Sequence, residues 1–106
     1  MAKMRVIIKR PDELYGHVTH ISSRLGNLQN TVGGYIETVF VTDDIVVICN
    51  EEGKIQNLPY NMKLMGDVIV GTIIVCSVDG DGFTDLKISF DHWKDFVDQQ
   101  QKWGCA

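Results

Sequence analysis

Three strand-sized runs of apolar residues constrain what this 106-residue chain can fold into more than any other feature. They are Tyr35–Val41, Ile45–Asn50 and Val68–Cys76. A strand with one face in water alternates apolar and polar residues, whereas these runs are apolar at consecutive positions. The sequence therefore predicts a small sheet whose main strands are buried on both faces.

The N-terminal third predicts a hairpin followed by a short helix. Met4–Lys9 is typical of a strand, and His17–Ile21 can return antiparallel beside it after a polar turn. Ser22 and Ser23 favour a helix start, with Leu25, Leu28 and Val32 at helical spacing behind them. The glycine pair at 33–34 then ends the helix, because glycine adopts the left-handed conformation at little cost.

The segment after Ile45–Asn50 predicts a second hairpin. The turn Asn50–Gly53 has the pattern of a type I turn with its glycine in the left-handed position, which would send Lys54–Leu58 back as a partner strand. Tyr60–Leu64, after a proline, predicts a short helical turn. The last element is an amphipathic helix beginning at Ser89.

These elements predict one domain, residues 1–106, of the α+β class. We expect a mixed, mainly antiparallel sheet of about five to six strands, one short internal helix and a C-terminal amphipathic helix. Two short helices would cover one face of such a sheet only. The other face would then be closed by sheet curvature, by the N-terminal hairpin or by a second copy of the chain, and we therefore expect a homodimer.

Composition and charge narrow the class of protein. Apolar residues make up 44% and charged residues 23%, as in soluble globular proteins, and no run reaches the ~20 apolar residues of a membrane span. The N-terminus lacks a signal-peptide core, so we expect a cytoplasmic protein with no membrane partner. Residues 35–106 hold twelve acidic and five basic side chains. Such a surface repels phosphate backbones and makes nucleic acid an unexpected partner, and imitation of DNA is disfavoured because the acidic residues are scattered.

The sequence gives little support for a metal or cofactor site. The thiols Cys49, Cys76 and Cys105 have no zinc-ligand spacing, and we expect the first two to behave as small hydrophobes. Asp79–Asp85 resembles the middle of a calcium loop, but a plain Asp-Gly turn is favoured because the position of the twelfth ligand is an isoleucine. The three histidines, His17, His20 and His92, are expected at the surface. We predict no metal, no cofactor and no catalytic residue.

A small set of polar residues stands among residues suited to burial and predicts a binding site. Glu37 is the most informative, because a carboxylate on an apolar strand needs either water or hydrogen-bond donors. It would serve a ligand or brace the neighbouring glycine turn, and the sequence leaves both interpretations open. The predicted ligand-binding residues are Tyr35, Glu37, Asn50, Glu51, Lys54, Tyr60 and Asn61.

The same region carries a family resemblance. The runs Val32–Glu37, Cys49–Lys54 and Leu58–Asn61, followed by Gly71-Thr72 before a strand, resemble a family of small bacterial and bacteriophage domains. That family is catalogued only as a domain of unknown function, number 3846, and the resemblance spans about residues 4–100. The chain differs by a shorter stretch after Asn61 and by the absence of a basic residue next to it. The resemblance implies an α+β fold and frequent carriage on phages and mobile elements, without an established activity.

These observations predict a non-enzymatic binding protein of phage or mobile-element origin that antagonises a host defence system. It would hold a host protein or sequester a signalling nucleotide. In the second case Tyr35 and Tyr60 would stack on a base, and Lys54, Lys63 and backbone amides would meet the phosphates. The alternatives are a small hydrolase that uses Glu37 as its base, and an accessory protein without a ligand.

Overall fold

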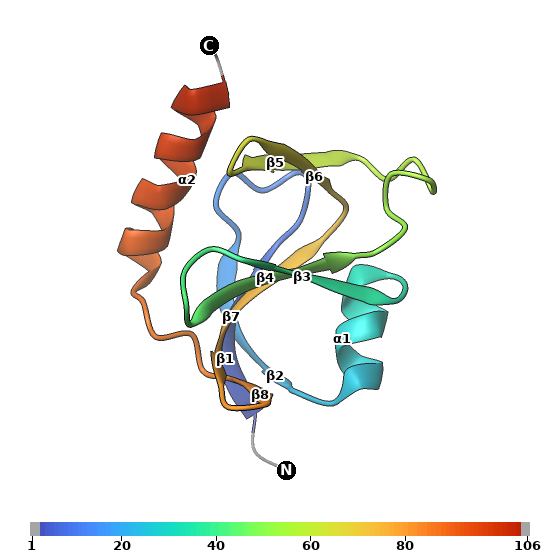
Figure 1. The fold of residues 1–106 in the computed structure, drawn as a ribbon, viewed down its shortest axis with the longest axis vertical. Coiled ribbons are helices and arrows are strands. Elements are labelled where there is room, and N and C mark those ends of the chain that lie inside the picture. Colours follow the sequence, from blue (N-terminus) through green and yellow to red (C-terminus); the bar gives the residue numbers. More distant parts are fainter. Residues whose placement is uncertain (1–2, 105–106) are drawn as a thin grey trace.

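The computed structural model describes residues 3–104 and shows the α+β fold expected from the sequence (Figure 1). A mainly antiparallel sheet, a short internal helix and a C-terminal helix are all present. The elements are β1 (Lys3–Lys9), β2 (His17–Ser22), α1 (Leu25–Val32), β3 (Ile36–Phe40), β4 (Ile45–Asn50), β5 (Tyr60–Leu64), β6 (Asp67–Val70), β7 (Ile73–Asp79), β8 (Gly82–Thr84) and α2 (Phe90–Gly104).

The main sheet has the strand order β2-β1-β7-β4-β3, and every neighbouring pair is antiparallel. The most apolar strands, β1, β7 and β4, occupy its centre, while β2 and β3 form its edges. The short β8 pairs with the C-terminal part of β7, through Ser77↔Thr84 and Asp79↔Gly82. Strands β5 and β6 form a separate two-stranded hairpin.

Both faces of the sheet are covered by the chain itself. Helix α1 packs on one face, where Leu28 and Val32 meet Val46 and Ile48 of β4. Helix α2 and the β5–β6 hairpin cover the other face, where Trp93 belongs to the same buried cluster as Val47 (Figure 1). The expectation that the helices would cover one face only was therefore wrong, because α1 and α2 lie on opposite faces, and the β5–β6 hairpin completes the cover beside α2. The homodimer stays a prediction, but the fold does not require it.

The predicted strand Val68–Cys76 is in fact two strands in two different sheets. Gly71 separates β6 from β7 with φ of 76°, in the left-handed region, and its N–H donates to Pro59 O at 2.8 Å. A Cβ at this position would stand 2.8 Å from Leu58 Cδ1. Glycine adopts this left-handed turn without strain and without displacing Leu58, so the apolar run folds back here instead of continuing.

The segment between β4 and β6 also differs from the prediction. Residues 51–57 form consecutive turns rather than a strand at Lys54–Leu58, and Gly53 is not among the residues with positive φ. Gly53 is buried instead, where a Cβ would stand 2.8 Å from Val70 Cγ2. Tyr60–Leu64 is strand β5 rather than a helical turn, because burial of Met62 and Leu64 favours the alternating pattern of a strand.

The predicted helix ends are largely confirmed. Helix α1 ends at Gly33, which has φ of 85° and donates to Gln29 O at 2.8 Å. It begins one residue later than the serine pair suggested, with Arg24 as N-cap. At α2, Ser89 Oγ accepts from His92 N at 3.1 Å, so Ser89 caps the helix as predicted. No helix in residues 3–104 has the length and apolar character to cross a membrane.

Candidate binding crevice

The seven predicted site residues lie in three separate places. Four of them, Glu37, Asn50, Glu51 and Lys54, line one crevice. Tyr60 and Asn61 line a second cavity, beside the β1–β2 loop and α2. Tyr35 lies in a third with Gln56 and the end of α1. The structure therefore brings together the acidic and amide residues around β4, and does not bring the two tyrosines to them.

The crevice lies between the β3–β4 pair, the turns that follow β4, and strand β6, and it encloses about 260 Å³. Its buried and half-buried floor is apolar apart from the Asn50 amide, and is lined by Val39, Cys49, Asn50, Val68, Ile69 and Val70. Its exposed rim is mostly charged, and is lined by Glu37, Glu51, Lys54, Ile55 and Asp67. We refer to these residues together as the acidic crevice.

The rim of the acidic crevice carries an excess of negative charge. It holds three carboxylates, on Glu37, Glu51 and Asp67, and one ammonium group, on Lys54. Lys54 Nζ lies 3.2 Å from Asp67 Oδ1, and both side chains are exposed. The lysine hydrogen bond and charge hold the pKa of Asp67 below its usual value. The only cation on this rim is thus already paired, which favours a positively charged group over a phosphate as the occupant.

Glu37 is an exposed residue, and its carboxylate contacts the thiol of Cys49. Cys49 Sγ donates to Glu37 Oε1 at 3.9 Å, a long and weak contact. Burial first, and the Glu37 charge second, raise the pKa of Cys49 to about 11. The thiol is therefore protonated at neutral pH and acts as part of the apolar floor. Because Glu37 is exposed, water reaches its carboxylate, which is one of the two conditions under which an apolar strand tolerates a carboxylate.

The glycine turn is braced by Asn50 instead. Asn50 is 5% exposed; its Nδ2 donates to Val32 O at 3.2 Å and to Gln56 Oε1 at 3.1 Å. Its Oδ1 accepts from Glu52 N at 2.8 Å. A Cβ on Gly34 would stand 2.9 Å from Asn50 Nδ2, which explains the second glycine of the pair. The Asn50 amide is thus occupied in joining α1 to the turns after β4.

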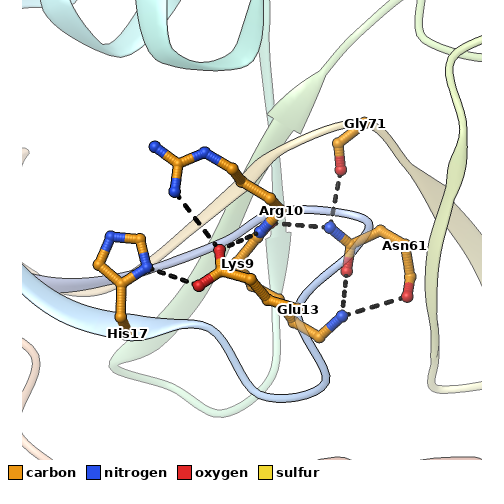
Figure 2. Close-up of polar contacts among 6 residues, drawn as sticks. All are labelled: Lys9, Arg10, Glu13, His17, Asn61 and Gly71. Atoms are coloured by element: carbon orange, nitrogen blue, oxygen red, sulfur yellow. Dashed lines mark hydrogen bonds and ion pairs between the residues drawn. The ribbon is translucent and has the colours of Figure 1, made fainter.

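Asn61 has a parallel role on the other side of the hairpin (Figure 2). Its Nδ2 donates to Lys9 O and to Gly71 O, both at 2.8 Å, and Lys9 Nζ donates to Asn61 Oδ1 at 2.8 Å and Asn61 O at 3.2 Å. Lys9 is 2% exposed. Its burial lowers the pKa of the ammonium group, against the opposing effect of the Glu13 charge. This network ties the end of β1 to β5 and to the Gly71 break.

The sequence interpretation did not single out Lys9, which is buried although lysine side chains are normally exposed. The loop that follows it is closed by Glu13, whose carboxylate accepts from Arg10 N at 3.0 Å (Figure 2). The second carboxylate oxygen lies 2.8 Å from His17 Nδ1. Despite partial burial, these hydrogen bonds and the neighbouring positive charges lower the pKa of Glu13. The loop contacts are local and structural in character.

The remaining predicted residues are placed as follows. Tyr60 is half exposed, and its hydroxyl donates to Gln101 Oε1 at 3.3 Å. Tyr35 is 67% exposed and precedes β3 rather than lying in it. Cys49 and Cys76 are buried free thiols, and Cys105 lies outside the described residues. Asp79–Gly82 closes the β7–β8 hairpin, as expected of an Asp-Gly turn, and within residues 3–104 no cluster of three metal-ligating side chains is found.

The sequence interpretation missed five residues of the crevice: Ile55, Asp67 and residues 68–70. The signal in the sequence was the glycine of the Met65-Gly66 pair. In the structure both residues of this pair have positive φ, as a type I′ hairpin turn requires. A hairpin turn at this pair places Asp67 next to the turns that follow β4. The ion pair between Asp67 and Lys54 joins opposite charges at the mouth of one crevice.

A comparison with protein-family models decides the family. The model of the domain of unknown function DUF3846 matches residues 4–98. The chain belongs to this family. Searches of curated proteins and of solved structures return no match for this DUF3846 chain. Several of the residues that suggested the family, among them Gly33, Gly34, Asn50 and Asn61, are the ones that join segments of this fold.

Proposed function

We propose that this DUF3846 protein is a non-enzymatic binding protein, carried by a phage or mobile element, that antagonises a host defence system in the host cytoplasm by binding a host protein. The acidic crevice carries the proposal. Its apolar floor suits the aliphatic stem of a lysine or arginine side chain, and its three rim carboxylates suit the cationic head. The family resemblance to phage-borne domains supports the biological setting.

The same charges make nucleotide sequestration the weaker form of the proposal. A phosphate in the crevice would meet three carboxylates and a lysine already paired with Asp67. Neither Tyr35 nor Tyr60 lines the crevice to stack on a base. The hydrolase and accessory-protein alternatives stay predictions that no feature of the crevice favours.

Affinity capture from host lysate tests the proposal. The bait is the intact protein, compared with a crevice variant, Glu37→Gln/Glu51→Gln, and with a control, Asp79→Asn/Asp81→Asn, that removes the same charge at the β7–β8 turn. We expect one host protein to be retained by the wild type and the control, to be lost in the crevice variant, and to be released by salt. Equal retention by both variants would contradict a role for the crevice.

A thermal-shift screen against cyclic and linear signalling nucleotides separates the two forms of the proposal. We expect no stabilisation by any nucleotide, because the rim is acidic. A concentration-dependent rise in melting temperature with one nucleotide would transfer support to sequestration.

A further inference from the structure

Strand β3 is an open edge of the main sheet. It pairs with β4 alone, so its other side has no strand partner among the described residues. Val41 N donates to Ile45 O at 2.8 Å, which shows that odd-numbered residues of this segment turn their backbone groups toward β4. By the alternation of a strand, the N–H and C=O of Thr38 point outward, away from the sheet.

The side chains around this edge are unusually exposed for their types. Tyr35 and Phe40, at the two ends of the strand, are 67% and 52% exposed, and Ile55 of the neighbouring crevice is 80% exposed. Tyr35 and Phe40 thus lie at opposite ends of one short strand, and Ile55 lies in the crevice beside it. Exposed apolar side chains along an unpaired edge are typical of an interaction surface.

The edge and the acidic crevice are continuous. Glu37 and Val39 belong to β3 and line the crevice, so their side chains lie on the sheet face that β6 covers. A strand added beside β3 would place every second side chain on this same face, directly beside Glu37. An opposite charge in that position would form a cross-strand pair and reach the crevice carboxylates.

We propose that β3 binds an extended, basic segment of a partner protein as an additional strand, with a lysine or arginine of that segment seated at the acidic crevice. This inference rests on the proposed function and names how the partner is held. Backbone hydrogen bonds at Thr38 supply the docking, and the crevice supplies the preference for a basic residue. A second copy of the chain is the poorer occupant, because it repeats the same carboxylates and the same net charge of −4.

Selection of a random linear peptide library on the intact protein provides the probe. We expect the enriched peptides to alternate β-branched or aromatic residues with other residues and to share one lysine or arginine. Their dissociation constants are then measured on the wild type, on Thr38→Pro and on Thr38→Val. Proline removes the outward N–H while sparing the hydrogen bonds to β4, a substitution that edge strands tolerate; valine keeps the N–H.

The proposal requires Thr38→Pro to weaken peptide binding at least about tenfold and Thr38→Val to leave it within about twofold. Glu37→Gln should weaken it by about two- to fivefold, and less at high salt. If Thr38→Pro proves unfolded by circular dichroism, N-methylation of alternate backbone amides in the selected peptide must abolish binding to the wild type instead.

The contradicting results are distinct from failure of the proposed function. An enriched set without a basic residue, no enrichment at all, or binding indifferent to both Thr38→Pro and peptide N-methylation would each overturn strand addition. A host protein captured in a crevice-dependent way that is retained by folded Thr38→Pro would leave the proposed function standing and overturn this inference alone.

Discussion

At the scale of single residues, the fold depends on two buried carboxamides and one buried ammonium group. Asn50 and Asn61 each hydrogen-bond to segments that are distant in the chain, and Lys9 completes the second network. A buried polar group that loses its partner costs about 1–3 kcal/mol. Each of these hydrogen-bond networks therefore stabilises the fold only while all of its members are present. The side-chain amides of Asn50 and Asn61, both predicted to bind a ligand, thus make their hydrogen bonds within the protein.

The Lys9 network makes a prediction about stability and pH. Lys9→Met should lower the free energy of unfolding by about 1–3 kcal/mol near neutral pH, because two oxygens of Asn61 lose their donor. Burial lowers the folded-state pKa of Lys9 from its ordinary value of 10.5, so between the two values the unfolded chain holds more protons. Raising the pH through this window should therefore stabilise the wild type relative to Lys9→Met.

Urea titrations of both proteins between neutral pH and pH 10.5 measure this difference. Lys87→Met, which removes an exposed lysine, controls for the loss of one positive charge. A difference between wild type and Lys9→Met that falls as the pH rises would show that the folded state favours the charged form, contrary to the effect of burial.

At the scale of elements, the Gly71 break decides where the β5–β6 hairpin lies and therefore where the crevice forms. Strands β6 and β7 come from one apolar run, but β6 pairs with β5 whereas β7 enters the main sheet between β1 and β4. The break places Asp67 and residues 68–70 over the β3–β4 pair. Without it, a single long strand would leave one face of the sheet without its hairpin cover.

Gly71→Ala and Gly80→Ala form a matched pair that tests the break. Both glycines have positive φ, at 76° and 63°, but a Cβ at Gly71 meets Leu58 at 2.8 Å whereas a Cβ at Gly80 meets nothing within 4 Å. We expect Gly80→Ala to cost about 1 kcal/mol from backbone strain alone, and Gly71→Ala to cost about 2–4 kcal/mol. Equal losses in urea denaturation would show that the contact with Leu58 is relieved without cost.

At the scale of the whole molecule, two cores share one central sheet. One lies under α1 and the other under α2 and the hairpin, and β4 and β7 contribute alternate residues to each. The chain closes both faces by itself, so the fold does not depend on whether a dimer forms. Light scattering, which distinguishes 11.9 kDa from twice that mass, tests the predicted homodimer. Loss of either core should unfold the sheet, and with it the other core, in a single transition.

Trp93 is the largest buried side chain by which α2 joins this unit. It is 1% exposed, stacks with Phe96 at a centroid distance of 5.6 Å, and donates from Nε1 to Tyr15 O at 2.9 Å. Trp93→Ala should cost about 3–5 kcal/mol, and Trp93→Phe, which keeps an aromatic ring, clearly less. Urea unfolding followed by circular dichroism measures both. A loss below 1 kcal/mol for Trp93→Ala would mean that α2 is not part of the cooperative unit.

Sequence interpretation succeeded where neighbours along the chain decide the structure. Strands β1, β3 and β4, the left-handed cap at Gly33 and the Ser89 cap follow from apolar runs and from conformations that glycine and serine favour locally. The α+β class and the family followed from the same signals. It failed at the Tyr60–Leu64 strand, where local patterns gave no warning that Met62 and Leu64 would be buried together.

What only the tertiary structure decided is which distant residues meet. The backbone turn at Gly71 is permitted by glycine but is set by contact with Leu58 and by the hydrogen bond to Asn61. Glu37 and Asp67 share a crevice although thirty residues separate them, because the hairpin packs over the β3–β4 pair. The sequence by itself determined strands β1, β3 and β4 and the helix ends, through short-range preferences. Their packing determined the site, because burial and long-range hydrogen bonds depend on how those elements close around one another.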